Sequence, residues 1–295
     1  MAPVLIDDAA RARLAGRFGA ELAGPWCDAL PDLVARLAAK WGLTVREARP
    51  GNTGRTLLCT GPAGELQVLK LTPDHEVARL EFAGLQAWKG CSRAVQVLDT
   101  DLDVGAILLE GLVPGTELRG RDVPWPQVGR LLTELHSVPP PAGLPPLTER
   151  VTFMYDITER TLAESAAGHL LPPGLLAEAR GRALALAGDG PVAVVHGDLH
   201  PGNVLDAGPR RGLVAIDPRP SVGDPAFDLA DWLYLPLAAG GTVDDGIEAL
   251  RPHLPGLDAG RARAWCAALA PLAALAPLRR GERTPFTDAL LEMAR

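Results

Sequence analysis

The sequence is poor in aromatic residues and cysteines, and it has no excess of positive charge. Aromatic residues make up 4% of the chain, and the four cysteines form neither a C-x-x-C pair nor zinc-site spacing. We therefore expect reduced, mostly structural thiols in a cytoplasmic protein. A net charge of −7 predicts no broad basic surface for nucleic acid, whose binding needs clustered Lys and Arg.

Long hydrophobic runs are also missing. The longest apolar run, residues 264–278, is too short to span a bilayer and contains Pro271 and Pro277. The first residues place Asp7 and Asp8 where a secretory signal needs a basic start and an uninterrupted apolar stretch. Neither a membrane association nor an export signal is expected.

The length of the chain allows two lobes, since 295 residues exceed the usual domain size of about 100–200 residues. A hydrophobic content of 47% can supply a sizeable core. We predict a first lobe over residues 1–110 and a second over residues 111–295, because glycine and proline break strand pairing in 111–115.

The first lobe is predicted to hold an antiparallel sheet. Residues 7–40 have the pattern of two amphipathic helices divided at Gly24-Pro25 and Leu30-Pro31. One further helix is expected over residues 75–89. Strand-like pieces, separated by turns rich in glycine and proline, are expected at residues 44–48, 56–60, 65–71, 94–98 and 104–110. The lobe should therefore contain five antiparallel strands and one internal helix.

The second lobe is predicted to be mainly helical. Its expected helices cover residues 125–137, 148–164, 175–187, 224–237, 260–278 and 285–294. Two short buried strands, residues 192–195 and 213–216, interrupt the helical order. They bracket the most unusual segment of the sequence.

That segment begins His196-Gly-Asp198, continues to Asn203, and is followed by a second strand that ends at Asp217. Each strand delivers a carboxylate, and an amide lies between them. Phosphoryl transfer uses such a set, because one Asp accepts the proton of the attacking hydroxyl while an Asn and a second Asp hold magnesium ions. The pattern predicts a phosphotransferase site.

On these residues the chain resembles the aminoglycoside phosphotransferase and kinase-like family, from about residue 44 to its end. It has Asp217-Pro-Arg where protein kinases carry Asp-Phe-Gly, and it has the family's G-D-P-x-x-D-L element from Gly223. Together with Leu135-His-Ser-Val-Pro, these motifs are similar to the streptomycin and hydroxyurea kinase branch. The resemblance implies a bilobal, protein-kinase-like α+β fold and ATP or GTP as the phosphate donor. It also implies Asp198 as the catalytic base and Asn203 and Asp217 as ligands of Mg²⁺.

Other polar residues of these motifs have structural explanations. Asp224 followed by Pro225 is what a helix N-cap with proline at the first helical position requires, and we expect Asp228 to be structural too. His196 is interpreted as a hydrogen-bond brace of the loop rather than as an acid or base. The role of His200 stays undecided.

Lys70 lies within an apolar strand, where an unpaired charge would be costly unless it met an anion. In kinases that anion is the nucleotide phosphates, and a helix glutamate orients the lysine. Glu81 is the expected partner and Glu76 the alternative. An edge-strand lysine that only extends into water is the other interpretation.

The turn between the first two strands holds Gly51, Asn52, Thr53 and Gly54, whose backbone N–H groups could cover phosphates. Two glycines in a hairpin can also be turn geometry alone, and the G-x-G-x-x-G of protein kinases is missing. By the resemblance alone, residues 110–113, with Glu110 and Leu112, present backbone groups to the nucleotide base.

Two rival classes of function fit parts of the sequence. His196-x-Asp198-x-His200 has the alternating spacing of some zinc or iron sites, which would suit a metal-dependent hydrolase if further ligands existed. A catalytically dead kinase-fold binding protein would lack a base or a metal ligand, whereas this chain retains the lysine, the base and both metal-ligand candidates.

The expected reaction transfers a γ-phosphate to a hydroxyl of a small molecule and inactivates an antibiotic. A region of one charge sign concentrates ligands of the opposite sign. Residues 224–258 are such a region, because Arg251 is their only Lys or Arg against the acids Asp224, Asp228, Asp231, Asp244, Asp245, Glu248 and Asp258. A cationic acceptor is therefore favoured, and a streptomycin-like aminoglycoside is the first candidate. Another antibiotic, such as a nucleoside type, is the second, and hydroxyurea or a primary metabolite is the third.

Overall fold

The structure is a computed structural model that describes residues 4–49, 51, 53–163 and 170–295. The chain forms two compact units: unit 1 is Met1–Thr116 with Asp206–Val214, and unit 2 is Glu117–Leu205 with Ala215–Arg295. The border lies beyond the one expected after residue 110, and the return of Asp206–Val214 to unit 1 was not expected. Arg211 explains that return, because its guanidinium binds the Glu110 carboxylate at 2.7 Å and donates to the carbonyl oxygen of Ala94 at 2.9 Å.

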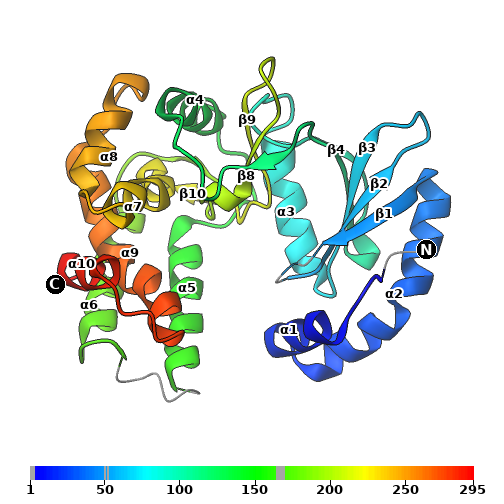
Figure 1. Ribbon diagram of the computed structural model, residues 1–295, viewed down its shortest axis with the longest axis horizontal. Coiled ribbons are helices and arrows are strands. Elements are labelled where there is room, and N and C mark those ends of the chain that lie inside the picture. Colours follow the sequence, from blue (N-terminus) through cyan, green and yellow to red (C-terminus); the bar gives the residue numbers. More distant parts are fainter. Residues whose placement is uncertain (1–3, 50, 52, 164–169) are drawn as a thin grey trace. The chain divides into compact units, whose positions relative to one another are not determined.

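Unit 1 contains a five-stranded antiparallel sheet of order β1-β2-β3-β5-β4, as predicted (Figure 1). The strand β4 begins later than expected, because Gln96 donates to the carbonyl oxygens of Cys91 and Ala94 at 3.0 and 2.8 Å and holds residues 91–96 in a turn. The strands are β1 Thr44–Arg49, β2 Arg55–Thr60, β3 Leu66–Leu71, β4 Val97–Asp101 and β5 Ala106–Glu110.

Helices cover both faces of this sheet. The helix α2 (Ala20–Trp41) packs on one face, where its Leu30, Val34 and Leu37 form a buried core with strand residues such as Leu69 and Leu71. The helix α3 (His75–Ala87) lies on the other face (Figure 1). Side chains alternate across a strand, so Lys70 points to the α3 side.

The predicted division of the N-terminal helices was wrong. The break lies at Gly19, with φ +84°, between α1 (Asp8–Phe18) and α2, and both Pro25 and Pro31 lie inside α2. Each internal proline costs about 3 kcal/mol or more through a lost hydrogen bond and a clash with the preceding turn. The long apolar face that α2 buries offsets this cost.

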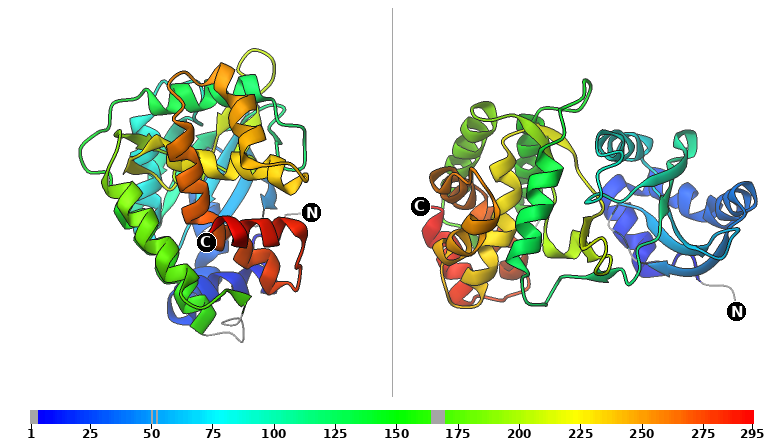
Figure 2. Two further views of the ribbon diagram at one scale, coloured as in Figure 1. Left: turned by 90° about the vertical axis from the view of Figure 1, so that its left-hand side faces the viewer. Right: turned by 90° about the horizontal axis from the view of Figure 1, so that it is seen from above.

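Unit 2 is mainly helical, as predicted. In Figures 1 and 2, α9 lies among its neighbours, and it contacts α6, α7, α8 and α10. The helices are α4 Trp125–His136, α5 Leu147–Ala163, α6 Leu175–Gly188, α7 Ala230–Ala238, α8 Val243–Leu250, α9 Ala259–Arg279 and α10 Pro285–Met293. Among the described helices, none combines the length and apolar character needed to cross a membrane.

Several short elements were not predicted. The helix α8 could have been found, because Thr242 and Asp245 form a capping box before an apolar pattern of Val243, Ile247 and Leu250. The strand β10 (Ser221–Gly223) pairs antiparallel with β7 (Ala193–Val195). A further small sheet has the order β6 (Thr116–Glu117), β8 (Val204–Asp206) and β9 (Leu213–Ala215). Of these short strands, β7 and β9 are the two buried strands that the sequence predicted at residues 192–195 and 213–216.

Candidate active site

The loop that follows β7 carries the candidate catalytic base. The β7 strand is three consecutive buried apolar residues, and the chain turns sharply at Gly197, where φ is +75°. A Cβ at this position would come within 2.0 Å of the carbonyl oxygen of Arg219, so only glycine fits the close approach. The turn directs the next residue, Asp198, out of the strand.

Two side chains hold Asp198, one at each oxygen of its carboxylate. The Asn203 side-chain amide donates to the Asp198 carbonyl oxygen at 2.9 Å and to its Oδ2 at 3.2 Å. On the other side, Arg150 Nη2 lies 3.7 Å from Asp198 Oδ1, and Arg150 Nε donates to the Gly197 carbonyl oxygen at 3.0 Å. The Asp198 side chain remains 36% exposed, so it is held in place and still accessible to a substrate.

The candidate metal ligands Asn203 and Asp217 are tied together through the backbone. The N–H of Ile216 donates to the carbonyl oxygen of Asn203 at 2.9 Å, which places the following residue, Asp217, next to this loop. Asp217 has φ +55°, the only positive φ outside glycine among the described residues, in a region that Asp tolerates better than most side chains. Its carboxylate lies 3.3 Å from Arg219 Nη1.

These residues suit Mg²⁺ rather than a metal held by protein ligands alone. The Asn203 amide nitrogen faces Asp198, so its oxygen is the atom that can act as a ligand. One carboxylate and one amide oxygen fit a hard cation that takes its other ligands from nucleotide phosphates and water. In the described part of the chain, no three His, Cys, Asp or Glu side chains are grouped as a metal site.

The two histidines of the loop bond to the backbone rather than to a shared metal position. His196 Nε2 lies 3.0 Å from the carbonyl oxygen of Ile216, which is the bracing contact expected from the sequence. Burial lowers the pKa of His196, so the ring is neutral and Nε2 donates. His200 Nδ1 accepts from the N–H of Gly202 at 3.0 Å and thereby caps a short turn. This geometry gives no support to the hydrolase reading.

Asp228 is structural, as expected, and it braces the loop that carries the base. Its carboxylate accepts hydrogen bonds from the backbone N–H groups of His196 and Gly197 at 2.7 and 2.9 Å, and it contacts His136 Nε2 at 3.0 Å. Burial alone would raise the pKa of Asp228, but the hydrogen bonds from the His136 side chain and the His196 backbone lower it. A buried, ionised Asp228 therefore sets the turn before Asp198.

Asp224 is also structural. It accepts from the N–H of Ala226 at 3.0 Å, as an N-cap does. Its other oxygen accepts from Arg261 Nε and Trp265 Nε1, both at 2.6 Å. The segment 225–229 that it caps is a 3-10 turn rather than the start of the expected helix over residues 224–237.

In unit 1, Lys70 lies in β3 and pairs with Glu81 of α3. The Lys70 Nζ donates to Glu81 Oε1, and the Glu81 side chain is 5% exposed. Because β3 lies between β2 and β5, Lys70 is not on an edge strand. The alternative partner, Glu76, pairs instead with Arg79 on the exposed side of α3.

The remaining predicted nucleotide contacts stay predictions. Gly54 lies so close to the backbone that an added Cβ would come within 2.0 Å of the Leu71 carbonyl oxygen, whereas Asn52 falls outside the described residues. Gly51 and Thr53 are the neighbours of Asn52 in the chain. The Glu110 side chain accepts from the N–H of Gln96 at 2.7 Å and pairs with Arg211, so it has structural partners. Leu112 is buried.

Sequence reasoning missed Arg150, which lies on α5, far from the loop that it contacts. Nothing near Arg150 in the sequence has a motif that marks it. Its guanidinium also lies 5.9 Å from the ring centre of Phe153, an aromatic residue that is 43% exposed. Only the packing of α5 reveals that Arg150 belongs to the site.

Comparisons with known proteins agree with this geometry. The sequence profile of a family described as aminoglycoside/hydroxyurea antibiotic resistance kinase matches residues 40–281. A hydroxyurea phosphotransferase from Kitasatospora aureofaciens is 37% identical over 262 residues, which are 84% of this chain and 73% of that protein. A streptomycin 6-kinase from Streptomyces griseus is 36% identical over 221 residues, 72% of this chain and 69% of that protein.

The solved structures add a similarity in fold. A choline kinase from Streptococcus pneumoniae aligns with a TM-score of 0.64 at 15% identity, covering 90% of this chain and 96% of that one. The resemblance to kinases that the sequence motifs indicated, and the bilobal α+β class that followed from it, are confirmed.

Proposed function

Because the chain belongs to the aminoglycoside/hydroxyurea antibiotic resistance kinase family, we propose that it transfers the γ-phosphoryl group of a nucleoside triphosphate to a hydroxyl of a streptomycin-like aminoglycoside. The observation that carries this proposal is the braced loop of unit 2, in which Asp198 lies beside Asn203 and Asp217. Phosphorylation would inactivate the antibiotic. The nucleotide donor is present in the cytoplasm, where we expect the enzyme to act.

In the proposed reaction, Asp198 accepts the proton of the acceptor hydroxyl as the hydroxyl oxygen bonds to the γ-phosphorus. The bond from that phosphorus to the β–γ bridging oxygen breaks in the same displacement. The products are a phosphate ester and a nucleoside diphosphate. Transfer is direct, without a phosphoenzyme, because no Ser or Cys nucleophile lies in the braced loop.

The protein's remaining roles concern the nucleotide. Asn203 and Asp217 would hold Mg²⁺, which neutralises phosphate charge when it is bound with the nucleotide. Lys70, oriented by Glu81, would pair with the phosphates. Backbone groups of residues 51–54 and 110–112 would contact the phosphates and the base, respectively.

Hydroxyurea is the second candidate acceptor, because the hydroxyurea phosphotransferase and the streptomycin 6-kinase are almost equally identical to this chain. The screen that decides is a reaction of purified protein with ATP or GTP, Mg²⁺ and a panel of streptomycin, other hydroxylated antibiotics, hydroxyurea and primary metabolites. Phosphorylation appears as a gain of about 80 Da, the mass of one transferred phosphoryl group. No gain on any acceptor would contradict the proposed function.

A further inference from the structure

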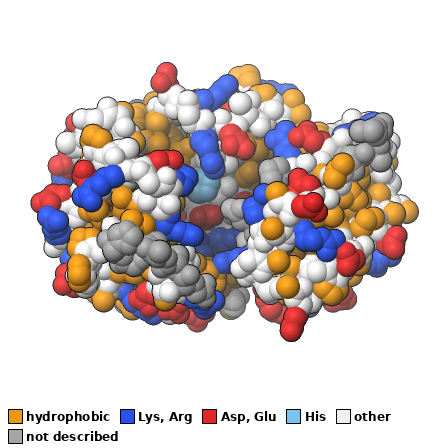
Figure 3. Space-filling model, turned by 60° about the horizontal axis from the view of Figure 1, so that its bottom comes forward, with side chains coloured by type: hydrophobic (Ala, Val, Ile, Leu, Met, Phe, Trp, Pro, Cys, Tyr) orange, Lys and Arg blue, Asp and Glu red, His pale blue; other side chains and the backbone are white. Residues whose placement is uncertain are grey.

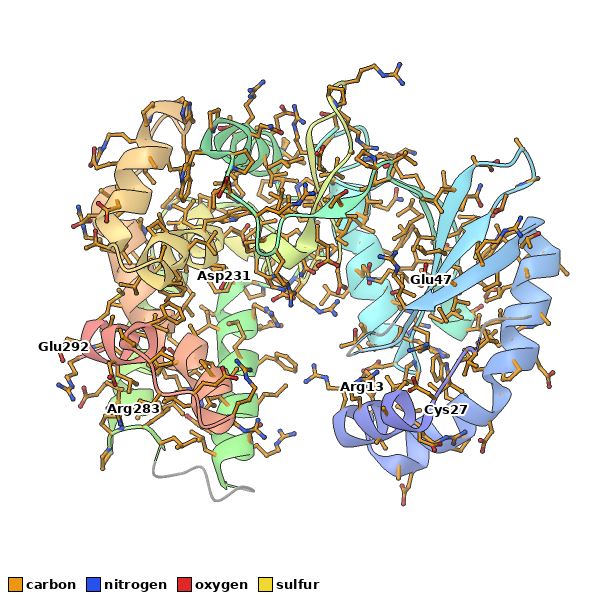
Figure 4. All side chains as sticks on the ribbon, viewed as in Figure 1. Arg13, Cys27, Glu47, Asp231, Arg283 and Glu292 are labelled. Atoms are coloured by element: carbon orange, nitrogen blue, oxygen red, sulfur yellow. The ribbon has the colours of Figure 1, made fainter. Side chains whose placement is uncertain are left out.

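The turn that follows β6 carries two exposed arginines, Arg119 and Arg121. Within the residues that the structure describes, neither guanidinium has a hydrogen bond or an ion pair. Several other arginines of unit 2 have an acidic partner in the chain. Arg283, which Figure 4 labels, pairs with Asp288 at 2.8 Å. The two unpaired guanidiniums are therefore available to an anion from outside the chain.

Backbone hydrogen bonds place Arg119 beside the loop that carries the candidate base. The N–H of Leu118 donates to the carbonyl oxygen of Val204 at 3.1 Å, and the N–H of Arg121 donates to the carbonyl oxygen of Leu118 at 3.0 Å. The Arg119 guanidinium lies against Gly202 of the loop, because a Cβ added to Gly202 would lie 2.8 Å from both Nε and Cζ of Arg119. Of the two arginines, Arg119 is thus the one with a defined position on the loop.

Gly202 leaves the space that this guanidinium occupies. Its φ is not positive, so its backbone conformation does not itself require glycine. The three atoms nearest to an added Cβ all belong to the Arg119 guanidinium. A side chain at position 202 would therefore displace the flexible end of Arg119 rather than the backbone of the loop.

The anion that fits this position is a phosphate of the donor. Asn203, a candidate Mg²⁺ ligand, follows Gly202 directly in the chain. A nucleotide whose Mg²⁺ is held by Asn203 brings phosphate oxygens to this part of the loop. An arginine stays charged and presents a planar fork of N–H donors that matches a phosphate. The other proposed cation, Lys70, already shares its charge with Glu81, so the phosphates need a further positive group.

The distribution of surface charge makes a single placed cation important. On the face shown in Figure 3, acidic and basic side chains are interspersed. The net charge of −7 gives an anion no attraction at long range. Binding of a nucleotide then depends on positive groups at the site itself.

We propose that Arg119 binds a phosphate group of the nucleoside triphosphate from its position over Gly202. This inference rests on the proposed phosphotransfer function and adds a residue that recognises the donor. Arg119 contacts the donor in this role, while the proton of the acceptor hydroxyl still goes to Asp198.

The test is calorimetric titration with ATP and Mg²⁺ in the absence of an acceptor, which measures affinity without turnover. Arg119→Ala should raise the Kd for ATP about 10-fold, as for a lost hydrogen bond between charged groups. Arg119→Lys keeps the charge without the fork and should restore part of the affinity. Arg121→Ala is the matched control, because it removes an exposed, unpaired arginine from the same turn, and its Kd should stay within about twofold of the wild type.

Adenosine, which lacks phosphates, separates the phosphates from the rest of the nucleotide. Its Kd should be the same for Arg119→Ala and the wild type. A loss as large with adenosine as with ATP would overturn the inference. An unchanged Kd for ATP in Arg119→Ala, or an equal loss in Arg121→Ala, would overturn it too.

Gly202→Ala tests the position of the guanidinium. Its methyl group should displace Arg119 and raise the Kd for ATP as much as Arg119→Ala does. The double variant should lose no more than either single variant, because both changes remove the same contact. Losses that add up would contradict the assigned position. Melting temperatures control folding, and if Gly202→Ala does not fold, the Arg119 and Arg121 variants decide alone.

Turnover is measured separately with the panel of acceptors. A wild type that binds ATP and phosphorylates no acceptor would contradict the proposed function, whereas weaker ATP binding by Arg119→Ala would still support the role of Arg119. If Arg119→Ala raises only the KM for an acceptor, its guanidinium binds an anionic group of that acceptor, and the inference is overturned although phosphotransfer stands.

Discussion

The two units position their functional side chains by different physical means. In unit 1, Lys70 occupies a regular position in a central strand, and the register of β3 with β5 determines the face to which it points. In unit 2, Asp198 and Asp217 lie on irregular backbone with positive φ at Gly197 and Asp217, and the carboxylate of the distant Asp228 accepts from the Gly197 N–H. A regular strand needs one partner for its lysine, whereas the loop depends on a network.

The largest expected effect breaks that network. Asp228→Ala removes the acceptor of two buried backbone N–H groups and leaves His136 without its partner. We expect the free energy of unfolding to fall by about 3–5 kcal/mol, as when a buried charged partner is lost. Equilibrium unfolding in urea measures this free energy in the variant and the wild type. Glu81→Ala in unit 1 is the comparison, and a loss as large in that variant would contradict the distinction between the units.

Asp198→Ala removes the proposed base and keeps the loop's other braces. Turnover should fall about 100-fold or more, the usual contribution of a general base, while nucleotide binding survives. Single-turnover kinetics and nucleotide titration measure the two quantities. Near-normal turnover would overturn the assignment of Asp198.

Substitutions of the two metal-ligand candidates should change the magnesium requirement more than a substitution of Lys70 does. Asn203→Ala and Asp217→Ala each remove an oxygen ligand of a hard cation, so the magnesium concentration for half-maximal activity should rise about 10-fold. Lys70→Ala should impair the positioning of phosphates with a smaller change in this concentration. If this magnesium concentration is the same in all three variants as in the wild type, the proposed site is contradicted.

Arg150 is expected to have a smaller effect, because Asn203 still holds Asp198 from the other side. Arg150→Ala should lower kcat by about 10-fold at an unchanged KM for the nucleotide, since it loses a charged hydrogen bond to the loop. Arg150→Lys keeps the charge and should recover part of kcat. A change in nucleotide KM alone would show that Arg150 acts elsewhere.

The sequence by itself determined the local features of this protein. Alternating apolar residues and glycine turns predicted the sheet of unit 1, because a strand exposes opposite faces with a period of two. The spacing from Asp198 to Asn203, followed by a strand and Asp217, predicted the catalytic loop, since each of these residues depends on its neighbours in the chain.

Only the tertiary structure decided which distant residues meet. Arg150 on α5 reaches the loop at Gly197, Arg211 returns a hairpin to unit 1, and packing rather than proline determined the length of α2. The acidic stretch shows the same limit, because the sequence predicted its net charge but not that Arg261 and Trp265 of α9 bond to Asp224. Such pairings depend on how helices pack, and helix packing depends on buried surfaces that sequence spacing does not specify.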